Sequence, residues 1–166
     1  MNKILAMFFI FFLSFVDAKE PFLAILKEVY TNDLQTFRYK EFSFVCKPYG
    51  VLTLEELYEQ SGSTPACKKA IEDFYIQHPS LKYLAEIKLH KEQLYHIVFR
   101  KEECIIYLNG QMSYSELLLR NGVAMENRSF NDKEFRSVFY DAQESARVEQ
   151  KGLWGSDIFG KCASER

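Results

Sequence analysis

The chain has 166 residues, of which 48% are apolar, and it carries a formal net charge of −2 with a pI near 6.0. This length and apolar content suffice for one ordinary domain with a hydrophobic core. Non-specific nucleic-acid binders are usually basic, so the charge does not favour a polyanion as the partner.

The first 18 residues have the pattern of a secretory signal peptide. Lys3 supplies a positive start, residues 4–16 are almost continuously apolar, and Val16-Asp17-Ala18 fits a small-residue cleavage site. The apolar run is shorter than the ~20 residues that a membrane span needs, which disfavours the alternative of an uncleaved anchor. We therefore expect cleavage after Ala18, one domain over residues 19–166, and a periplasmic or secreted protein that has no membrane contact after cleavage.

Strands dominate the pattern of the next hundred residues, with one clear helix among them. Apolar runs that favour strands, with partial alternation from Phe42 on, and turn signals predict the strands Phe22–Val29, Gln35–Tyr39, Glu41–Lys47, Leu84–Leu89, Leu94–Arg100 and Cys104–Leu108. Residues 53–60 favour a short helical turn. A longer helix is predicted over Pro65–Gln77, because Thr64 can cap it and Pro65 suits its first position.

Two further helices are indicated by their ends. Ser113-Tyr-Ser-Glu116 has the form of a capping box, and Gly122 supplies the left-handed stop of the helix that follows. Asn131-Asp-Lys-Glu134 has a similar capping-box pattern, with Glu three residues after a possible cap. It precedes a second helix that Gly152 ends. The apolar stripe of this second helix consists of Phe135, Val138, Phe139, Ala142 and Ala146.

The order and spacing of these C-terminal residues resemble the staphylococcal nuclease (thermonuclease) family. The resemblance is carried by Asn109-Gly110, by the run Ser-Glu-Leu-Leu-Leu-Arg-Asn-Gly-Val-Ala over residues 115–124, by Glu144-Ser-Ala-Arg147 and by Lys151-Gly-Leu-Trp154. It implies an α+β fold that is mainly β, a five-stranded OB-fold barrel with about three packed helices. The family's catalytic residues come from earlier in the chain.

The family's catalytic motif is Arg, Leu, any residue, Gly, a hydrophobic residue, Asp, any residue, Pro and Glu, and it aligns without a gap on residues 47–55. The family's first calcium-binding Asp lies fourteen residues before that Arg, and Asp33 lies fourteen residues before Lys47. The resemblance thus implies Asp33 as a metal ligand, Glu55 as the general base and Lys47 as a phosphate-binding cation.

Which residue corresponds to the family's second Arg depends on the anchor, the position at which this chain is aligned with the family. With Gly110 as the anchor it falls on Lys101, with Arg100 beside it as the alternative. With Tyr95-His96 as the anchor it falls on Ile97, which would remove the cation.

Two departures from the family weaken the catalytic interpretation. Lys47 replaces a guanidinium that binds phosphate through two parallel donors. Leu52 replaces the second metal-ligand Asp, and Ca²⁺ needs several oxygen ligands. Asp33 can equally be a turn residue and Glu55 an ordinary acid at a helix N-terminus.

The sequence therefore predicts an exported, thermonuclease-like protein with a degenerate active site, which serves as a binding or interaction module or as a weak nuclease. The alternative is an active Ca²⁺-dependent phosphodiesterase that cleaves DNA or RNA. The candidate partners are a nucleic acid, which the net charge does not favour, and an envelope or extracellular protein.

The cysteines Cys46, Cys67, Cys104 and Cys162 all lie in the exported part of the chain. An even number in an oxidising compartment predicts two disulfides, and three pairings are open. We favour Cys46–Cys67, which would tie a strand end to the following helix, and Cys104–Cys162, which would pin the C-terminal tail to a strand. A zinc site is a weaker alternative, because the sequence contains no CxxC pair.

Overall fold

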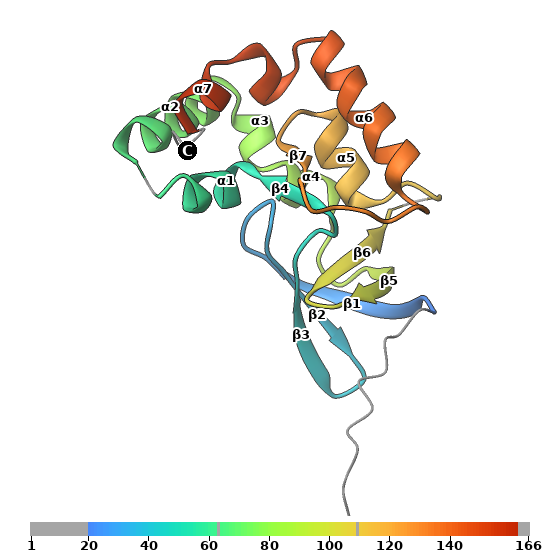
Figure 1. Ribbon diagram of the computed structural model, residues 1–166. Helices are drawn as coiled ribbons and strands as arrows, with labels where there is room; N and C mark the ends of the chain where they lie inside the picture. Colours follow the sequence, from blue (N-terminus) through green and yellow to red (C-terminus); the bar gives the residue numbers. More distant parts are fainter. Residues whose placement is uncertain (1–19, 63, 109, 163–166) are drawn as a thin grey trace, which may run out of the picture.

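The computed structural model describes residues 20–62, 64–108 and 110–162. The predicted signal peptide and Asn109 lie outside these residues. The described chain combines a five-stranded antiparallel sheet with helices that gather at one end of it (Figure 1). The strands are β1 Phe22–Val29, β2 Gln35–Tyr39, β3 Phe42–Cys46, β4 Val51–Thr53, β5 Leu94–Arg100, β6 Glu103–Tyr107 and β7 Ala124–Glu126. The helices are α1 Leu54–Gln60, α2 Pro65–Gln77, α3 Pro79–Lys82, α4 Leu84–Lys88, α5 Tyr114–Arg120, α6 Arg136–Val148, the 3-10 turn η1 Gly152–Gly155, and α7 Ile158–Cys162.

The main sheet has the order β3-β2-β1-β5-β6, and a separate two-stranded ladder joins β4 to β7. The sheet is not closed into a barrel, which differs from the expected OB barrel. Its two edge strands nevertheless approach each other at a parallel bridge between Pro48 and Cys104. There the Tyr49 amide donates to the Cys104 carbonyl at 3.0 Å, and the Cys104 amide donates to the Lys47 carbonyl at 2.8 Å.

Two hydrophobic clusters hold these layers together. The larger lies between the sheet and helices α4, α5 and α6, and Leu26, Phe37, Ile97 and Phe139 are fully buried in it. The smaller joins α1, α2, η1 and α7. Since burial of apolar area is the main favourable term in folding, the second cluster gives the short C-terminal helices their attachment.

One predicted strand is wrong, because Leu84–Leu89 forms helix α4 and the start of the segment that leads to β5. The buried Asn32 explains the difference, since its side-chain oxygen accepts a hydrogen bond from the Ala85 amide at 3.0 Å. This bond satisfies one of the free amides at the helix N-terminus. Leu84, Ala85 and Leu89 are then buried and Ile87 is exposed, which is the pattern of one helical face.

The C-terminal helices agree with the sequence at two of their four ends. The Ser113 hydroxyl accepts from the Glu116 amide at 3.1 Å, and Gly122 adopts the left-handed conformation with φ of 63°. The predicted end of α6 at Gly152 is wrong: α6 ends at Val148, Gln150 takes the left-handed conformation with φ of 51°, and Gly152 is the first residue of η1. The predicted cap at residues 131–134 is wrong: α6 begins at Arg136, because the Asp132 carboxylate accepts from the Glu134 amide in a separate turn.

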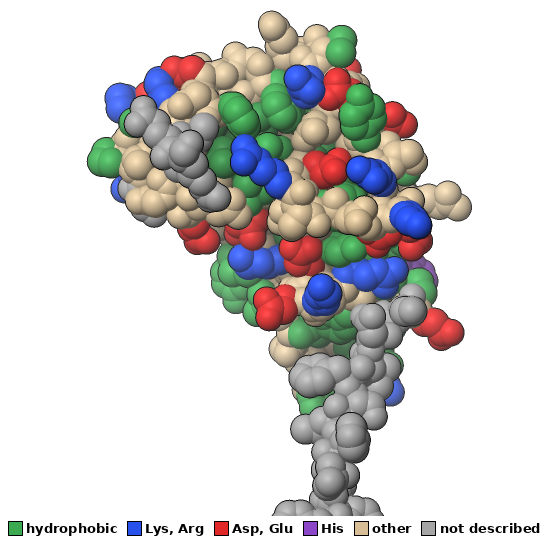
Figure 2. Space-filling model, in the orientation of Figure 1, with side chains coloured by type: hydrophobic (Ala, Val, Ile, Leu, Met, Phe, Trp, Pro, Cys, Tyr) green, Lys and Arg blue, Asp and Glu red, His purple; other side chains and the backbone are tan. Residues whose placement is uncertain are grey.

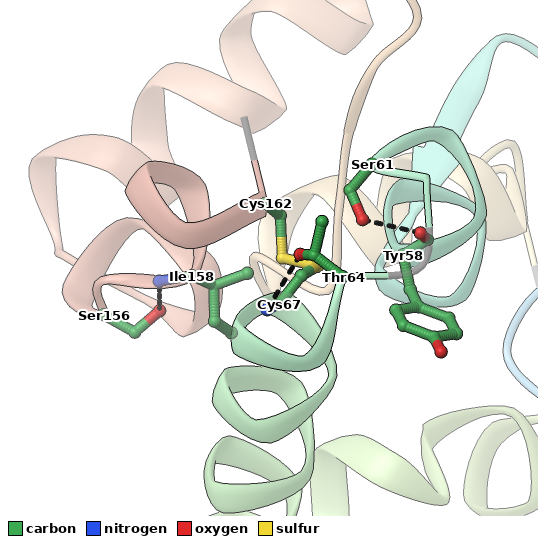
Figure 3. The surroundings of a disulfide bond; sticks show 7 residues. All are labelled: Tyr58, Ser61, Thr64, Cys67, Ser156, Ile158 and Cys162. Carbon is green, nitrogen blue, oxygen red and sulfur yellow. Dashed lines mark hydrogen bonds between the residues drawn. A yellow bond between two sulfur atoms is a disulfide. The ribbon is translucent and has the colours of Figure 1, made fainter. Parts of the chain in front are cut away.

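The structure contains two disulfides, as predicted, but the pairing that we favoured is wrong. Cys46 is bonded to Cys104, with 5.5 Å between their Cα atoms, and Cys67 is bonded to Cys162 at 4.6 Å. The first bond joins the two edge strands of the sheet. The second joins the first turn of α2 to the end of α7 (Figure 3), and both of its cysteines are buried in the smaller cluster.

Candidate functional site

A cleft of about 950 Å³ opens beside the end of β3 and the β5–β6 turn. The basic residues among those that line it are Lys47, Arg100, Lys101 and Lys133. Lys47, Arg100 and Lys101 are the cations that the sequence proposed for the phosphate. The structure therefore brings Lys47 and both candidates for the second cation to one cavity, although they come from separate segments of the chain.

Lys47 is already paired inside this cleft. Its ammonium donates to Glu56 Oε1 at 3.1 Å. This hydrogen bond raises the pKa of the Lys47 ammonium, against the opposing effect of partial burial, so Lys47 stays charged. Glu56 in turn completes a capping box with Thr53, the residue before α1. The start of α1 therefore fixes the carboxylate that holds Lys47.

The backbone around Gly50 shapes the floor of the cleft. Gly50 has φ of 73°, and a Cβ there would lie 2.4 Å from the Phe130 ring, so only glycine fits. Its amide donates to Glu103 Oε2 at 2.9 Å. Tyr49 donates its hydroxyl to Asp132 at 2.9 Å, and burial, helped by this bond, raises the pKa of Tyr49 to about 12.

Arg100 and Lys101 contribute to the cleft in different ways. The Arg100 guanidinium lies 3.6 Å from the Glu134 carboxylate and donates to the Phe99 carbonyl at 3.3 Å. Lys101 is exposed at the tip of the turn and adopts φ of 59°. With Lys47 held by Glu56 and Arg100 beside Glu134, these two cations are largely neutralised by carboxylates of the same chain.

Glu55 lies in a different cavity from Lys47. It lines a small cavity of about 70 Å³ together with Tyr30, Tyr83 and Glu86. Its Oε1 accepts from the Tyr75 hydroxyl at 2.9 Å, whereas its Oε2 is buried and has no partner among the described residues. Burial raises the pKa of the Glu55 carboxyl, and the negative charge of Asp33 raises it further.

Asp33 lies in the turn between β1 and β2, where the Thr31 hydroxyl donates to its carboxylate. Its negative charge helps to raise the pKa of both the Glu55 carboxyl and the Lys47 ammonium, although Asp33 lines neither of the two cavities. The neighbouring Asn32 is fully buried and holds this turn against the helices, because its side-chain nitrogen donates to the Leu81 carbonyl at 3.0 Å.

A calcium site does not fit this arrangement. Leu52, at the position of the family's second carboxylate, packs against the smaller hydrophobic cluster. Within residues 20–62, 64–108 and 110–162, no group of three or more His, Cys, Asp or Glu side chains could hold a metal ion. Asp33 would be the one carboxylate from the expected set, which is too few for a hard cation of this kind.

The structure also identifies partners that the sequence interpretation missed. Thr53-Leu-Glu-Glu56 has the T-x-x-E signature of a capping box, so the role of Glu56 was readable. Tyr75 and Asn32 had no comparable signal, because they meet Glu55 and Ala85 through tertiary contacts.

No protein-family model matches this chain, and no curated protein sequence matches it either.

Proposed function

We propose that the chain is an exported, thermonuclease-like protein of OB-fold type whose nuclease site is degenerate, and that it acts as a binding module. The observation that carries this proposal is the separation of the expected catalytic groups. Glu55 is bonded to Tyr75 in one cavity, and Lys47 is bonded to Glu56 in another. A general base has to reach the nucleophile that attacks the phosphorus, and here it is turned to a tyrosine instead.

The OB-fold part of the proposal is supported by the five-strand antiparallel order and by the bridge that links the edge strands at Cys104. Export is supported by the apolar N-terminal run and by the use of all four cysteines in disulfides. Among the helices of the described residues, none has the length and apolar character that a membrane crossing requires.

The cleft at Lys47 is the binding surface that we propose. Its walls carry cations and carboxylates side by side, among them Glu56, Glu103 and Asp132. On the face drawn in Figure 2, acidic and basic side chains are likewise interspersed. A polyanion gains little from such a surface, whereas a protein with its own mixed charges can pair with it. We therefore favour an envelope or extracellular protein as the partner.

A weak nuclease is the second candidate, and one observation favours it. Lys47, Arg100 and Lys101 line the same cleft, so two cations could flank a phosphate there if Lys47 left Glu56. Each missing electrostatic contact costs on the order of 10²-fold or more in rate, which is why we expect this activity to be small at most.

The test is digestion of DNA and RNA by the oxidised and the reduced protein, each with and without calcium, beside the variant Glu55→Gln. The proposal predicts no calcium-dependent digestion above the background of the variant. Calcium-dependent digestion that Glu55→Gln abolishes would establish the nuclease instead. Digestion that this variant leaves unchanged would exclude Glu55 as the base.

A further inference from the structure

The β2–β3 hairpin, at the end of the sheet remote from the helices (Figure 1), ends in an exposed aromatic pair. Tyr39 and Phe42 stand directly opposite each other across the hairpin. By the alternation of a strand, Phe42 is on the same side as Phe44 and Cys46, and Tyr39 is on the same side as Phe37. That side faces the core elsewhere, yet Phe42 is 73% exposed and Tyr39 is 37% exposed.

Tyr39 continues an aromatic cluster that begins inside the sheet. The ring centroids of Phe44 and Phe99 are 4.9 Å apart, those of Phe22 and Phe99 are 5.3 Å apart, and those of Phe22 and Tyr39 are 5.0 Å apart. Phe42 lies opposite Tyr39 at the end of the hairpin. A core-facing row of aromatic side chains that runs on into solvent indicates a surface that a partner covers.

The position of the pair along the chain indicates which partner this is. Phe22 is the first residue of β1, so the chain enters the fold beside Tyr39. The apolar N-terminal run ends at Val16, and residues 16–22 can span at most about 20 Å. Such a run lies in the bilayer during export. While the run is attached, Phe22 is therefore held within that distance of the membrane, and the Tyr39 ring lies beside Phe22 with 5.0 Å between the ring centroids.

The chemistry of the hairpin tip suits the same surface. Lys40 follows Tyr39 and holds its ammonium 5.1 Å from the centre of that ring. Arg38, one residue earlier, is exposed on the opposite face of the strand, and Glu41 is the acidic residue of the tip. Aromatic rings favour the boundary between lipid headgroups and acyl chains, and lysine and arginine are attracted to anionic headgroups.

We propose that the hairpin tip, Arg38 to Phe42, docks on the surface of a bilayer that contains anionic lipid. The contact keeps the protein at the membrane after the apolar run is removed, which differs from the sequence expectation of no membrane contact. It does not depend on the proposed function of the cleft, since the two surfaces share no residue.

The test is co-sedimentation with vesicles of phosphatidylcholine, with and without phosphatidylglycerol. The protein begins at Lys19, because residues 20–162 contain every contact described above. We expect binding to the anionic vesicles. Phe42→Ser should lower the partition coefficient about tenfold, as expected for one large apolar side chain. Lys40→Gln should lower it about fivefold on anionic vesicles and leave it unchanged on neutral ones.

Val148→Ser is the matched control, because Val148 is 81% exposed on α6 and lies outside the hairpin. It should bind vesicles as the parent protein does. Absence of binding to either vesicle, or equal binding by the Phe42→Ser and Val148→Ser proteins, would overturn the proposal. Self-association in solution that Phe42→Ser abolishes, without vesicle binding, would also overturn it and would assign the hairpin tip to a second copy of the chain.

Discussion

The backbones of Gly122 and Gly152 approach each other closely, and replacing Gly122 with alanine should be costly. Both residues have positive φ, 63° and 56°. The Gly122 carbonyl accepts from the Leu153 amide at 2.8 Å, which fastens the end of α5 to η1. A Cβ on Gly122 would lie 2.3 Å from the Lys151 carbonyl oxygen, and one on Gly152 would lie 2.1 Å from the Gly122 oxygen.

The cost of Gly122→Ala has two parts. A left-handed alanine costs about 1–2 kcal/mol relative to glycine. The Cβ then displaces the backbone of residues 151–152, and overpacking of this kind costs about 1–3 kcal/mol more. We therefore expect the free energy of unfolding to fall by about 2–5 kcal/mol. Gly62 separates the two parts, because its φ is 70° but a Cβ there meets nothing within 4 Å.

Urea unfolding of the two alanine variants measures the difference. Gly62→Ala should lose only the conformational part, about 1–2 kcal/mol. Gly122→Ala should lose more and shift the unfolding midpoint further to low urea at an unchanged slope. If the two variants lose the same free energy, the close approach of residues 122 and 152 contributes nothing to stability, and the account of this junction is refuted.

Three further predictions concern the site and the crosslinks. Burial raises the pKa of the Glu55 carboxyl, so the contribution of Glu55 to stability is fully present below its usual pKa and is lost as pH rises through the raised value. The urea midpoint of the Glu55→Gln protein should therefore depend less on pH between pH 4 and 8 than that of the parent protein. Identical pH profiles of the two proteins would contradict this. Replacing Cys67 and Cys162 together with serine should cost about 4 kcal/mol in unfolding free energy, because the bond closes a sequence separation of 95 residues; a loss below about 1 kcal/mol would show that the smaller cluster holds α7 without it. A double-mutant cycle of Lys47→Met and Glu56→Gln should give a coupling of about 0.5–1 kcal/mol that falls in high salt, because the Lys47 side chain is partly exposed; a coupling that salt leaves unchanged would argue against an ion pair.

Strands β1, β2, β3, β5 and β6 and the helix α2 were predictable because local pattern specifies them, whereas the short strands β4 and β7 were not predicted. The bounds of β1, β2, β5 and α2 agree with the sequence prediction at both ends. β1 begins with a run of five apolar residues and β2 is rich in residues that favour strands, and α2 has both a cap at Thr64 and a proline at its first position. These elements can be predicted without knowledge of contacts with residues far away in the sequence.

Helix α4 could not be predicted in the same way. Its apolar residues fit a strand as well as one short helical turn, and the deciding bond comes from Asn32, which lies 53 residues before Ala85. The disulfide pairing failed for a similar reason. Cys46 and Cys104 meet because the sheet curves until its two edge strands, β3 and β6, approach each other at the bridge between Pro48 and Cys104, and that approach follows from the topology of the whole sheet.

Only part of the expected arrangement of the candidate site is present in the structure, since Asp33 and Glu55 do not line the cleft that contains Lys47. Lys47 and the two candidates at 100 and 101 share a cleft, as the resemblance implied for the phosphate-binding cations. The separation of Glu55 from that cleft depends on the Tyr75 hydroxyl, which α2 places beside it. The spacing of residues along the chain carries no information about such a competing hydrogen bond.

Calcium binding tests most directly the proposal that this chain has no working metal-dependent nuclease site. Calcium is titrated calorimetrically to about 10 mM into the oxidised protein, a range that covers the weak sites of extracellular modules. The account predicts no saturable binding and the same trace for Asp33→Asn. Saturable binding that Asp33→Asn abolishes would contradict it, because Asp33 would then belong to a working metal site.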